Sequence, residues 1–402
     1  MVDLHSKHME CPVLSDRVKR LQPSPTLAVT ARAAELRAEG RDIIALGAGE
    51  PDFDTPEFIK QAAVKALENG ETKYTAVDGT PRLKKAIIEK FKRDNGLDYQ
   101  ADQILVSCGG KQSFFNLFQS VINPDDEVVM MAPYWVSYPA MVEIAGGKPV
   151  VISADAASRY KITPEQLDKA ITPKTKVVVL NSPSNPTGVA YSRAELEALG
   201  AVLRKHSHVL IATDDMYEHI LWADEPFSNI VMACPDLYDR TLVMNGVSKA
   251  YAMTGWRIGY TAGPADIIKA MKKVQSQSTS NPAAVSQAGA AAALEGDQGC
   301  VAKMREAFRE RHSFVLDALN QLPGVKAVPA DGTFYSFPAI GEAISKLGLK
   351  DDIAFCEHLL NEAGVAVVPG TAFGSPGHFR LSFATSMDHL QQAMQRLKEV
   401  LK

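Results

Sequence analysis

Cysteine is scarce in this chain of 402 residues, which has 5 cysteines, far apart and odd in number. None belongs to a Cys-x-x-Cys pair or to a Cys/His cluster with zinc-ligand spacing, so neither a disulfide framework nor a metal site is indicated. Unpaired thiols are typical of the reducing cytosol. We therefore expect a cytoplasmic protein without a bound metal.

A surplus of positive charge and long apolar runs are also missing. The 43 Lys and Arg residues against 47 Asp and Glu give a formal net charge of -4, which provides no basic field for nucleic acid or an anionic membrane. No apolar run reaches the roughly 18 residues of a membrane-spanning helix. Residues 1–10 carry charges where a signal peptide would be apolar, and we expect residues 1–12 to be a disordered N-terminus.

What the chain does have is an ordinary globular composition, with 46% hydrophobic and 22% charged residues. Its length allows more than one hydrophobic core. From about residue 103 onward, helical segments separate short apolar runs, which lie at residues 104–107, 127–130, 149–152, 176–180 and 209–212. Runs with so little polar alternation are typical of parallel strands covered on both faces. This alternation predicts an α/β protein with a doubly wound, mostly parallel sheet.

A second unit is expected after this sheet. A long helix over residues 298–322 leads into it, and strands are expected near residues 325–328, 333–337, 365–368 and 379–383. Helices near residues 351–363 and 387–400 make this a smaller α+β domain. We expect a large domain of residues 57–297 and a discontinuous small domain of residues 13–56 and 298–402.

One stretch, residues 246–259, places a lysine between small residues and follows it with Gly-x-Arg-Ile-Gly. Apolar, β-branched runs at residues 240–245 and 258–262 flank it, so Lys249 is expected in a tight connection at a strand end. Dehydration there favours the neutral, nucleophilic amine. A single lysine is more often a surface residue, but this whole pattern resembles the pyridoxal-phosphate attachment site of the class I aminotransferases.

The resemblance covers nearly the whole chain, from Pro23 to the last helix. It is closest to the bacterial aspartate aminotransferases of subgroup Iβ, on residues 48–56, 109–112, 133–139 and 252–257. It implies a fold-type-I pyridoxal-phosphate transferase, in which a large domain with a mostly parallel sheet between helices carries the cofactor beside a smaller α+β domain.

Two aspartates and a tyrosine follow the apolar run at residues 209–212. An aspartate in such a place is often only a helix cap or a solvated turn. The resemblance implies that Asp214 is the partner of the pyridinium nitrogen and that Tyr217 donates to the phenolic oxygen of the cofactor. Asp215 is expected to be a solvated neighbour or a structural hydrogen-bonding residue.

Gly109 and Gly110 precede an expected helix, whose free amides and dipole favour an anion. A Gly-Gly pair before a helix is weak by itself, but Arg257 adds a planar, two-pronged phosphate partner. The resemblance implies that Ser248 also contributes at the phosphate. It further implies a homodimer in which Tyr74 reaches the phosphate of the partner subunit.

Four further positions match the family's ligand contacts. Trp135 matches the ring-stacking position, although aromatic residues are usually core. Asn185 lies in a proline-pinned loop and matches a second donor to the phenolic oxygen. Gly49 can let the backbone approach a ligand closely. Arg380 lies in an alternating strand, where most arginines face solvent, but matches the clamp on the substrate α-carboxylate.

The second carboxylate of a dicarboxylic substrate needs its own cation. The resemblance implies that Lys111 serves it, with the hydroxyls of Ser24 and Thr26, although Lys111 can also contact the phosphate. Gln22 stands where relatives that accept prephenate carry a basic residue, which disfavours prephenate. Gly246 stands where the family often has serine.

The implied reaction is ping-pong transamination through a Schiff base (aldimine) on Lys249, with L-aspartate and 2-oxoglutarate giving oxaloacetate and L-glutamate. Amino acids and 2-oxo acids are then the partners of the chain. An aminotransferase for aromatic or neutral amino acids, or for prephenate, is the nearest alternative, and another pyridoxal-phosphate reaction such as β-elimination is a further one. A ligand-sensing regulator is disfavoured, because the family pattern begins by about residue 17 without a helix-turn-helix before it.

Overall fold

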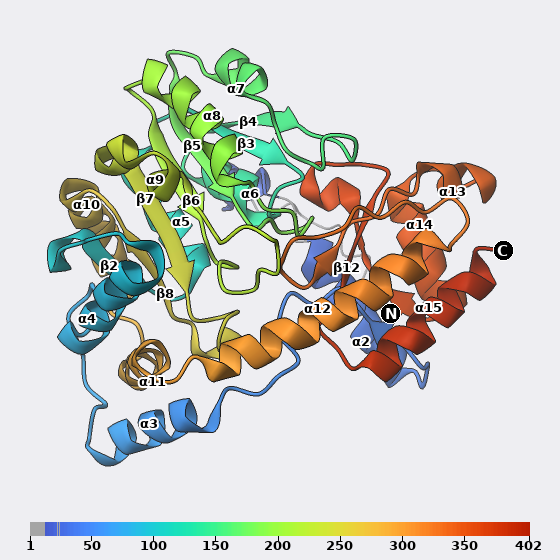
Figure 1. The fold of residues 1–402 in the computed structure, drawn as a ribbon, viewed down its shortest axis with the longest axis horizontal. Coiled ribbons are helices and arrows are strands. Elements are labelled where there is room, and N and C mark those ends of the chain that lie inside the picture. The colour runs from blue at the N-terminus through green and yellow to red at the C-terminus, as the bar shows by residue number, and fades with distance from the viewer. Residues whose placement is uncertain (1–12, 22, 24) are drawn as a thin grey trace, which may run out of the picture.

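The computed structural model describes residues 13–21, 23 and 25–402 (Figure 1), so the expectation for residues 1–12 lies outside the described residues. Its centre is a sheet of 7 strands in the order β2-β8-β7-β6-β5-β3-β4. Only β8 runs against the others, because it pairs antiparallel with both of its neighbours. The other pairs are parallel. The prediction of a mostly parallel α/β sheet is confirmed.

The strands of this sheet coincide with the predicted apolar runs. They are β2 (Ile104–Ser107), β3 (Glu127–Ala132), β4 (Lys148–Ser153), β5 (Thr175–Asn181), β6 (Leu210–Asp214), β7 (Thr241–Gly246) and β8 (Gly259–Ala262). Residues of β2, β7 and β8 are all buried, whereas β4 at the edge is partly exposed. Continuous apolar runs are therefore found where the sheet is covered on both faces.

The helices of this unit pack on the two faces of the sheet or, like α3 on α11, against other helices. They are α3 (Glu57–Glu68), α4 (Pro81–Lys90), α5 (Gly110–Val121), α6 (Ser137–Ile144), α7 (Pro164–Ala170), α8 (Arg193–Lys205), α9 (Ile230–Ala233), α10 (Ala265–Ser276) and α11 (Ala284–Glu295). Successive residues of a strand point to opposite faces. Val178 therefore belongs to one hydrophobic cluster, with Leu196 of α8, and Val177 belongs to another, with Phe114 of α5.

Local signals set several of these helix starts. Thr163 and Ser192 form capping boxes with the residues three positions later, and Thr80 caps α4, whose first residue is Pro81. Short 3₁₀ or π turns complete the unit and the one that follows: η1 (Phe91–Asn95), η2 (Ala101–Gln103), η3 (Pro235–Arg240), η4 (Thr254–Trp256), η5 (Leu359–Ala363) and η6 (Gly370–Phe373).

The long helix α12 (Gly299–Asn320) runs from this sheet to a second unit (Figure 1). That unit contains the parallel pair β1 (Ile44–Ala45) and β10 (Val365–Ala366), and the antiparallel sheet β11 (Val368–Pro369), β12 (Phe379–Ser382) and β9 (Tyr335–Ser336). Its helices are α2 (Pro25–Ala38), α13 (Gly341–Lys346), α14 (Asp352–His358) and α15 (Met387–Val400). The short helix α1 (Asp16–Lys19) comes from the same N-terminal segment but contacts α6 of the first unit.

The strand expected near residues 325–328 is wrong. Lys326 makes only an isolated bridge with Ala339, through two backbone hydrogen bonds of 2.8 and 2.9 Å. Pro329 comes directly after residues 325–328. It has no backbone N–H to donate to a strand ladder, so the pairing does not continue.

The N-terminal segment is joined to the C-terminal one by the pairing of β1 with β10. A separate hydrophobic cluster contains Ile44 together with Val365 and Leu390. On this basis we propose residues 57–297 as the large domain, and residues 13–56 with 298–402 as the small one.

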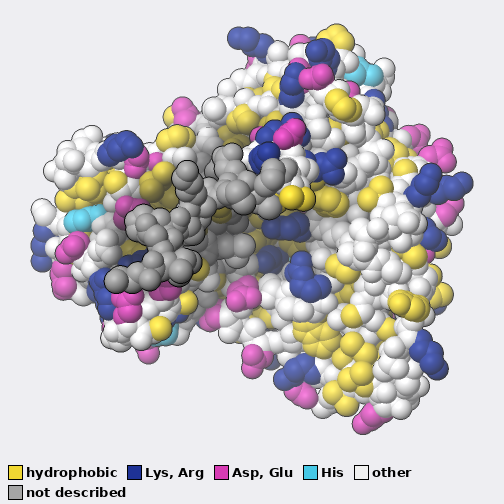
Figure 2. All heavy atoms as spheres, turned by 180° about the vertical axis from the view of Figure 1, so that it is seen from behind, with side chains coloured by type: hydrophobic (Ala, Val, Ile, Leu, Met, Phe, Trp, Pro, Cys, Tyr) yellow, Lys and Arg dark blue, Asp and Glu magenta, His cyan; other side chains and the backbone are white. Residues whose placement is uncertain are grey.

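Basic and acidic side chains are interspersed over the face shown in Figure 2. Among the described residues, none of the helices combines the length and the apolarity that crossing a membrane requires.

Candidate active site

A cavity of about 400 Å³ lies where the carboxyl ends of β5, β6 and β7 meet the small unit. Both units contribute to its wall, which is where ligands bind in open α/β sheets. The wall contains most of the site residues predicted from the sequence: Thr26, Gly49, Gly110, Lys111, Trp135, Asn185, Asp214, Tyr217, Ser248, Lys249, Arg257 and Arg380.

Lys249 follows β7 by three residues and is partly buried. Its Nζ donates to the carbonyl oxygen of Gly49. Burial lowers the pKa of the amine to about 8, while the nearby charge of Glu50 opposes that shift. The lowered pKa therefore increases the neutral fraction of the amine near neutral pH, which is the form that a nucleophile or a general base requires.

Asp214 is the last residue of β6 and is buried. The hydroxyl of Tyr138 donates to one carboxylate oxygen, and the amide of Met216 donates to the other at 3.2 Å. Burial raises the pKa of Asp214 to about 6, and the hydrogen bonds from Tyr138 and Met216 oppose the rise. A buried carboxylate of this kind favours a protonated, cationic group beside it.

Gly109 and Arg257 form a tight pair at the start of α5. Gly109 has a φ of 85°, and a Cβ on it would lie 2.3 Å from Nη2 of Arg257. The guanidinium is held by the carbonyl oxygens of Thr254 at 2.9 Å and Cys108 at 3.3 Å. It therefore stands at a helix start, where free amides also favour an anion.

Steric crowding explains why the last residue of the Gly-x-Arg-Ile-Gly pattern, Gly259, is a glycine. A Cβ on Gly259 would lie 2.4 Å from the backbone nitrogen of Gly110. Gly246 is also crowded, because a Cβ there would lie 3.0 Å from the carbonyl oxygen of Ile258. Together these glycines allow β7, β8 and the start of α5 to approach one another closely.

Arg380 lies on β12, and only 2% of it is exposed. Its Nη1 donates to Oδ1 of Asn185 at 3.0 Å, and its Nη2 donates to the carbonyl oxygen of Gly47 at 2.7 Å. Within the described part of the chain it has no acidic partner, and its Nε has no hydrogen-bond partner. Burial lowers the pKa of this guanidinium. A buried cation in this state favours a carboxylate ligand.

Lys111 and Trp135 lie together in the cavity wall, with Nζ 5.4 Å from the centre of the indole ring. Burial and the charge of Arg257 lower the pKa of Lys111. Thr26 reaches the wall from α2. Ser24 and Gln22 lie outside the described residues.

Tyr74 does not reach this cavity. Its side chain is 92% exposed, in the loop between α3 and α4, and it lines a separate surface depression with Leu67 and Asn281. No other residue of that depression was predicted as a site residue.

Two tyrosines belong to the site although the sequence assigned them no role. Tyr335 of β9 lies with its hydroxyl 2.8 Å from that of Tyr217, and Tyr138 of α6 contacts Asp214. Tyr138 follows Trp135 by only three residues, and this proximity to a predicted site residue is a signal that could have found it. Tyr335 has no such signal, because the pairing of β9 with β12 brings it to the site.

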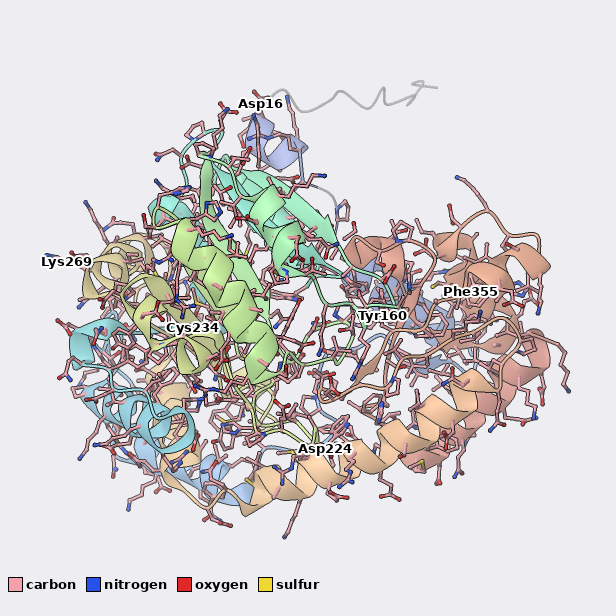
Figure 3. The ribbon with its side chains drawn as sticks, turned by 45° about the horizontal axis from the view of Figure 1, so that its top comes forward. Asp16, Tyr160, Asp224, Cys234, Lys269 and Phe355 are labelled. Carbon is pink, nitrogen blue, oxygen red and sulfur yellow. The ribbon has the colours of Figure 1, made fainter. Side chains whose placement is uncertain are left out.

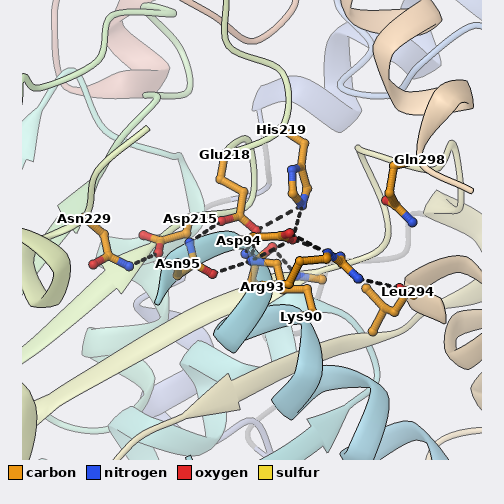
Figure 4. A network of polar contacts seen from close by, with 12 residues as sticks. Lys90, Arg93, Asp94, Asn95, Asp215, Glu218, His219, Asn229, Leu294 and Gln298 are labelled. Atoms are coloured by element: carbon orange, nitrogen blue, oxygen red, sulfur yellow. Dashed lines mark hydrogen bonds and ion pairs between the residues drawn. The ribbon is translucent and has the colours of Figure 1, made fainter. Parts of the chain in front are cut away.

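Asp215 is not a solvated neighbour, since only 1% of it is exposed, and the structural alternative holds. It accepts hydrogen bonds from Thr213 at 2.7 Å and Asn229 at 2.6 Å. Burial, and then the charge of Glu218, raise its pKa to about 7. Figure 4 shows it with Asn229 beside a network of polar contacts around Glu218.

Glu218 is the centre of that network. It pairs with Lys90 and accepts hydrogen bonds from Asn95 at 2.9 Å and Asn245 at 2.8 Å. Although burial acts in the opposite direction, the charge of Lys90 dominates the lowering of the pKa of Glu218 to about 2. Because Asn245 lies on β7 and Asp215 directly follows β6, the network supports the strand ends that carry Asp214 and Lys249.

Comparisons with known proteins agree with this geometry. The family model described as aminotransferase class I and II matches residues 41–397. A protein of Nitrosomonas europaea named aspartate/prephenate aminotransferase is 60% identical over 394 residues, covering 96% of this chain and 99% of that protein.

Solved structures agree as well. That of the Rhizobium meliloti aspartate aminotransferase superposes with a TM-score of 0.93 at 48% identity, covering 96% of this chain and 98% of the other. That of the Thermus thermophilus aspartate aminotransferase with maleate gives 0.91 at 45% identity, with coverage of 96% and 99%.

Proposed function

Because the chain belongs to the class I and II aminotransferase family, we propose that it transfers the amino group of L-aspartate to 2-oxoglutarate, with pyridoxal phosphate as cofactor. The products are oxaloacetate and L-glutamate. The observation that carries this proposal is the convergence of Lys249, Asp214 and Arg380 on one cavity. They offer an amine for covalent attachment, a buried carboxylate for a cationic ring and a guanidinium for a substrate carboxylate.

The residues present fit pyridoxal phosphate. The start of α5 and Arg257 would hold its phosphate, with the hydroxyl of Ser248 close by, and a Cβ on Gly109 would fill that cradle. Tyr217 and Asn185 would donate to the phenolic oxygen, and Trp135 offers an aromatic face. When bound, the cofactor supplies an electron sink for the negative charge that forms at the substrate Cα.

The protein's own groups would then orient the substrate and move its proton. Arg380 would bind the α-carboxylate and turn the Cα–H bond toward Lys249. With its pKa lowered to about 8, the Lys249 amine can accept that proton and later return it as a general acid. Asp214 would hold the ring nitrogen protonated.

A dicarboxylic substrate is supported by a second cation in the same wall. Lys111 would bind the distal carboxylate, with Thr26 and Ser24 as hydroxyl donors. The Thermus thermophilus relative was solved with maleate, itself a dicarboxylate. Prephenate is a second candidate acceptor, because the Nitrosomonas europaea relative is named for it as well.

The active unit would be a homodimer in the cytoplasm. Tyr74 would reach the phosphate of the second copy, which is supported by its exposure and by the exposed apolar side chain of Leu67, which lines the same depression. The four cysteines of the described residues are free thiols, which is the state that cysteines keep in a reducing compartment.

Half-reaction spectroscopy tests the proposal. The purified holoenzyme mixed with L-aspartate alone should lose its visible absorption band and release oxaloacetate, and 2-oxoglutarate should restore the band. Lys249→Ala should show no turnover. A panel of aspartate, alanine and phenylalanine as donors, with 2-oxoglutarate or prephenate as acceptor, then fixes the substrate class. Absence of any spectral change with dicarboxylic amino acids would reject the substrate assignment.

A further inference from the structure

Tyr335 lies between the two halves of the site, and only 1% of it is exposed. Its neighbour across the antiparallel pair is Ser382, which makes Arg380 its diagonal neighbour on the same face. The guanidinium carbon of Arg380 lies 4.5 Å from the centre of the Tyr335 ring. The hydroxyl lies 2.8 Å from that of Tyr217, which comes from the other unit. Tyr335 thus contacts both the expected carboxylate clamp and the expected donor to the cofactor.

The hydroxyls of Tyr217 and Tyr335 have few hydrogen-bond partners, and this limits which of them can donate to a ligand. Within the described residues, each has the other as its one hydrogen-bond partner. Burial raises the pKa of both, so both keep their protons at neutral pH. One hydroxyl must donate and the other accept. Only if Tyr335 donates does Tyr217 retain its own proton for a ligand in the cavity.

The Tyr335 side chain is held in place. A Cβ on Gly49 would lie 2.9 Å from its hydroxyl oxygen, so the Gly49 backbone closes one side. The centre of the Phe334 ring lies 4.7 Å from the centre of the Tyr335 ring, and the backbone amide of Tyr335 donates to the hydroxyl of Thr333 at 3.1 Å. A side chain confined by packing and by backbone contacts can orient a neighbour without the cost of ordering it at each turnover.

We propose that Tyr335 is a positioning residue with two separable actions. Its hydroxyl donates to Tyr217 and so directs the Tyr217 proton to the phenolic oxygen of the cofactor. Its ring supports Arg380 in the orientation that binds the substrate carboxylate. This inference rests on the proposed function, since it assigns Tyr335 a part in the same site.

Tyr335→Phe isolates the hydroxyl, because it keeps the ring beside Arg380. A hydrogen bond donated to the phenolic oxygen favours the form in which that oxygen carries its full negative charge. Weakening that bond should raise the pH at which the visible absorption of the bound cofactor titrates by about 0.5 to 1 unit, as expected for one hydrogen bond. The Kd for maleate, a non-reacting dicarboxylate, should stay within about twofold of the wild-type value.

Tyr335→Leu removes the ring as well. It should show the same spectral shift and also weaken maleate binding by about 3- to 30-fold, the range expected for a desolvated cation–π contact. Titration of the holoenzyme with maleate, followed by absorption or by calorimetry, gives this Kd without any turnover. An unchanged Kd would overturn the action of the ring.

A double-mutant cycle shows whether Tyr335 acts through Tyr217. Tyr217→Phe should shift the titration by at least as much as Tyr335→Phe, and the double variant should shift it no further than Tyr217→Phe alone. Additive shifts would overturn the proposed route. So would a Tyr335→Phe enzyme that titrates like the wild type.

Tyr160→Phe is the matched control. The Tyr160 hydroxyl is buried and donates to the carbonyl oxygen of Phe337 at 2.9 Å, away from the cavity wall, and Figure 3 shows this residue at the boundary between the two units. The Tyr160→Phe variant should lose a similar amount of stability and leave the titration of the cofactor absorption unchanged.

Measurements on the wild-type holoenzyme show whether the proposed function fails or only this inference. If it neither binds pyridoxal phosphate nor transaminates aspartate, the proposed function and this inference both fail. If it does both while Tyr335→Phe is silent, only this inference fails.

Discussion

Gly109 shows at the scale of one residue how the expected phosphate cradle is built. We expect Gly109→Ala to weaken the binding of pyridoxal phosphate to the apoenzyme by about 10- to 100-fold, because the added methyl group displaces a guanidinium whose hydrogen bonds to an anion are each worth about 1.5–3 kcal/mol. Gly40→Ala is the control. Gly40 has nearly the same backbone strain, with a φ of 87°, but open space around it. Equal losses of cofactor affinity in the two variants would contradict the steric account.

The burial of the Asp214 carboxyl group lowers the stability of the folded protein at neutral pH. Burial raises its pKa to about 6, so the folded apoenzyme binds this proton more tightly than the unfolded chain. Its contribution to the free energy of unfolding therefore falls as pH rises from about 4 to about 6, and it stays low above that range. We expect Asp214→Asn to increase the free energy of unfolding by about 1–3 kcal/mol more at about pH 8 than at about pH 4. Denaturant titrations of both apoproteins measure this difference, and a pH-independent effect would contradict it. The variant should lose transamination.

At the scale of elements, the Lys90–Glu218 pair ties the strand ends of the site to α4 (Figure 4). Lys90→Met leaves a buried carboxylate without its cation, which should cost about 3–5 kcal/mol of unfolding free energy. Adding Glu218→Gln removes that unpaired charge and should recover at least half of the loss. Lys346→Met breaks an exposed pair with Glu342 and should change stability by less than about 1 kcal/mol. A double variant no more stable than Lys90→Met would contradict this account.

Helices and strands are the features that could be predicted best from the sequence. Strands buried on both faces, such as β5 and β7, leave continuous apolar runs, and helix starts such as Ser192 leave a capping signal. The buried state of Asp215 leaves none, because its partner Asn229 follows 14 residues later, outside the repeat of any one helix or strand. The apolar run near residues 325–328 resembles a strand, yet its pairing stops after one bridge. Local pattern thus predicts elements well and long-range partners poorly.

At the scale of the whole molecule, residues of both units line the cavity, and the contacts between the units leave no local sequence signal. Motifs at strand ends and the family resemblance together predicted Lys249, Asp214 and Arg257 as site residues, and the three line one cavity, where carboxyl ends of parallel strands meet. Tyr335 reaches the site from the small unit through the pairing of β9 with β12, a register that no local signal records. Its contact with Tyr217 joins the two units across the cavity.

The proposed dimer contact around Tyr74 can be tested by a substitution at Leu67. Leu67 on α3 is 51% exposed and lines the same depression as Tyr74, so a second copy that receives Tyr74 would cover it. We expect Leu67→Glu to bury an unpaired carboxylate at that contact and to raise the dimer Kd at least about 100-fold. Sedimentation of the holoenzyme over a range of concentrations measures this Kd.

Val151→Glu is the control for that prediction. Val151 on the edge strand β4 is 43% exposed, lies outside that depression, and carries the same change from apolar to acidic. It should leave the dimer intact. Because Tyr74 would act only across the contact, Leu67→Glu should also weaken the binding of pyridoxal phosphate once the protein is diluted below its new Kd, and should regain affinity at high protein concentration. A Leu67→Glu protein that stays dimeric would place the contact elsewhere on the molecule.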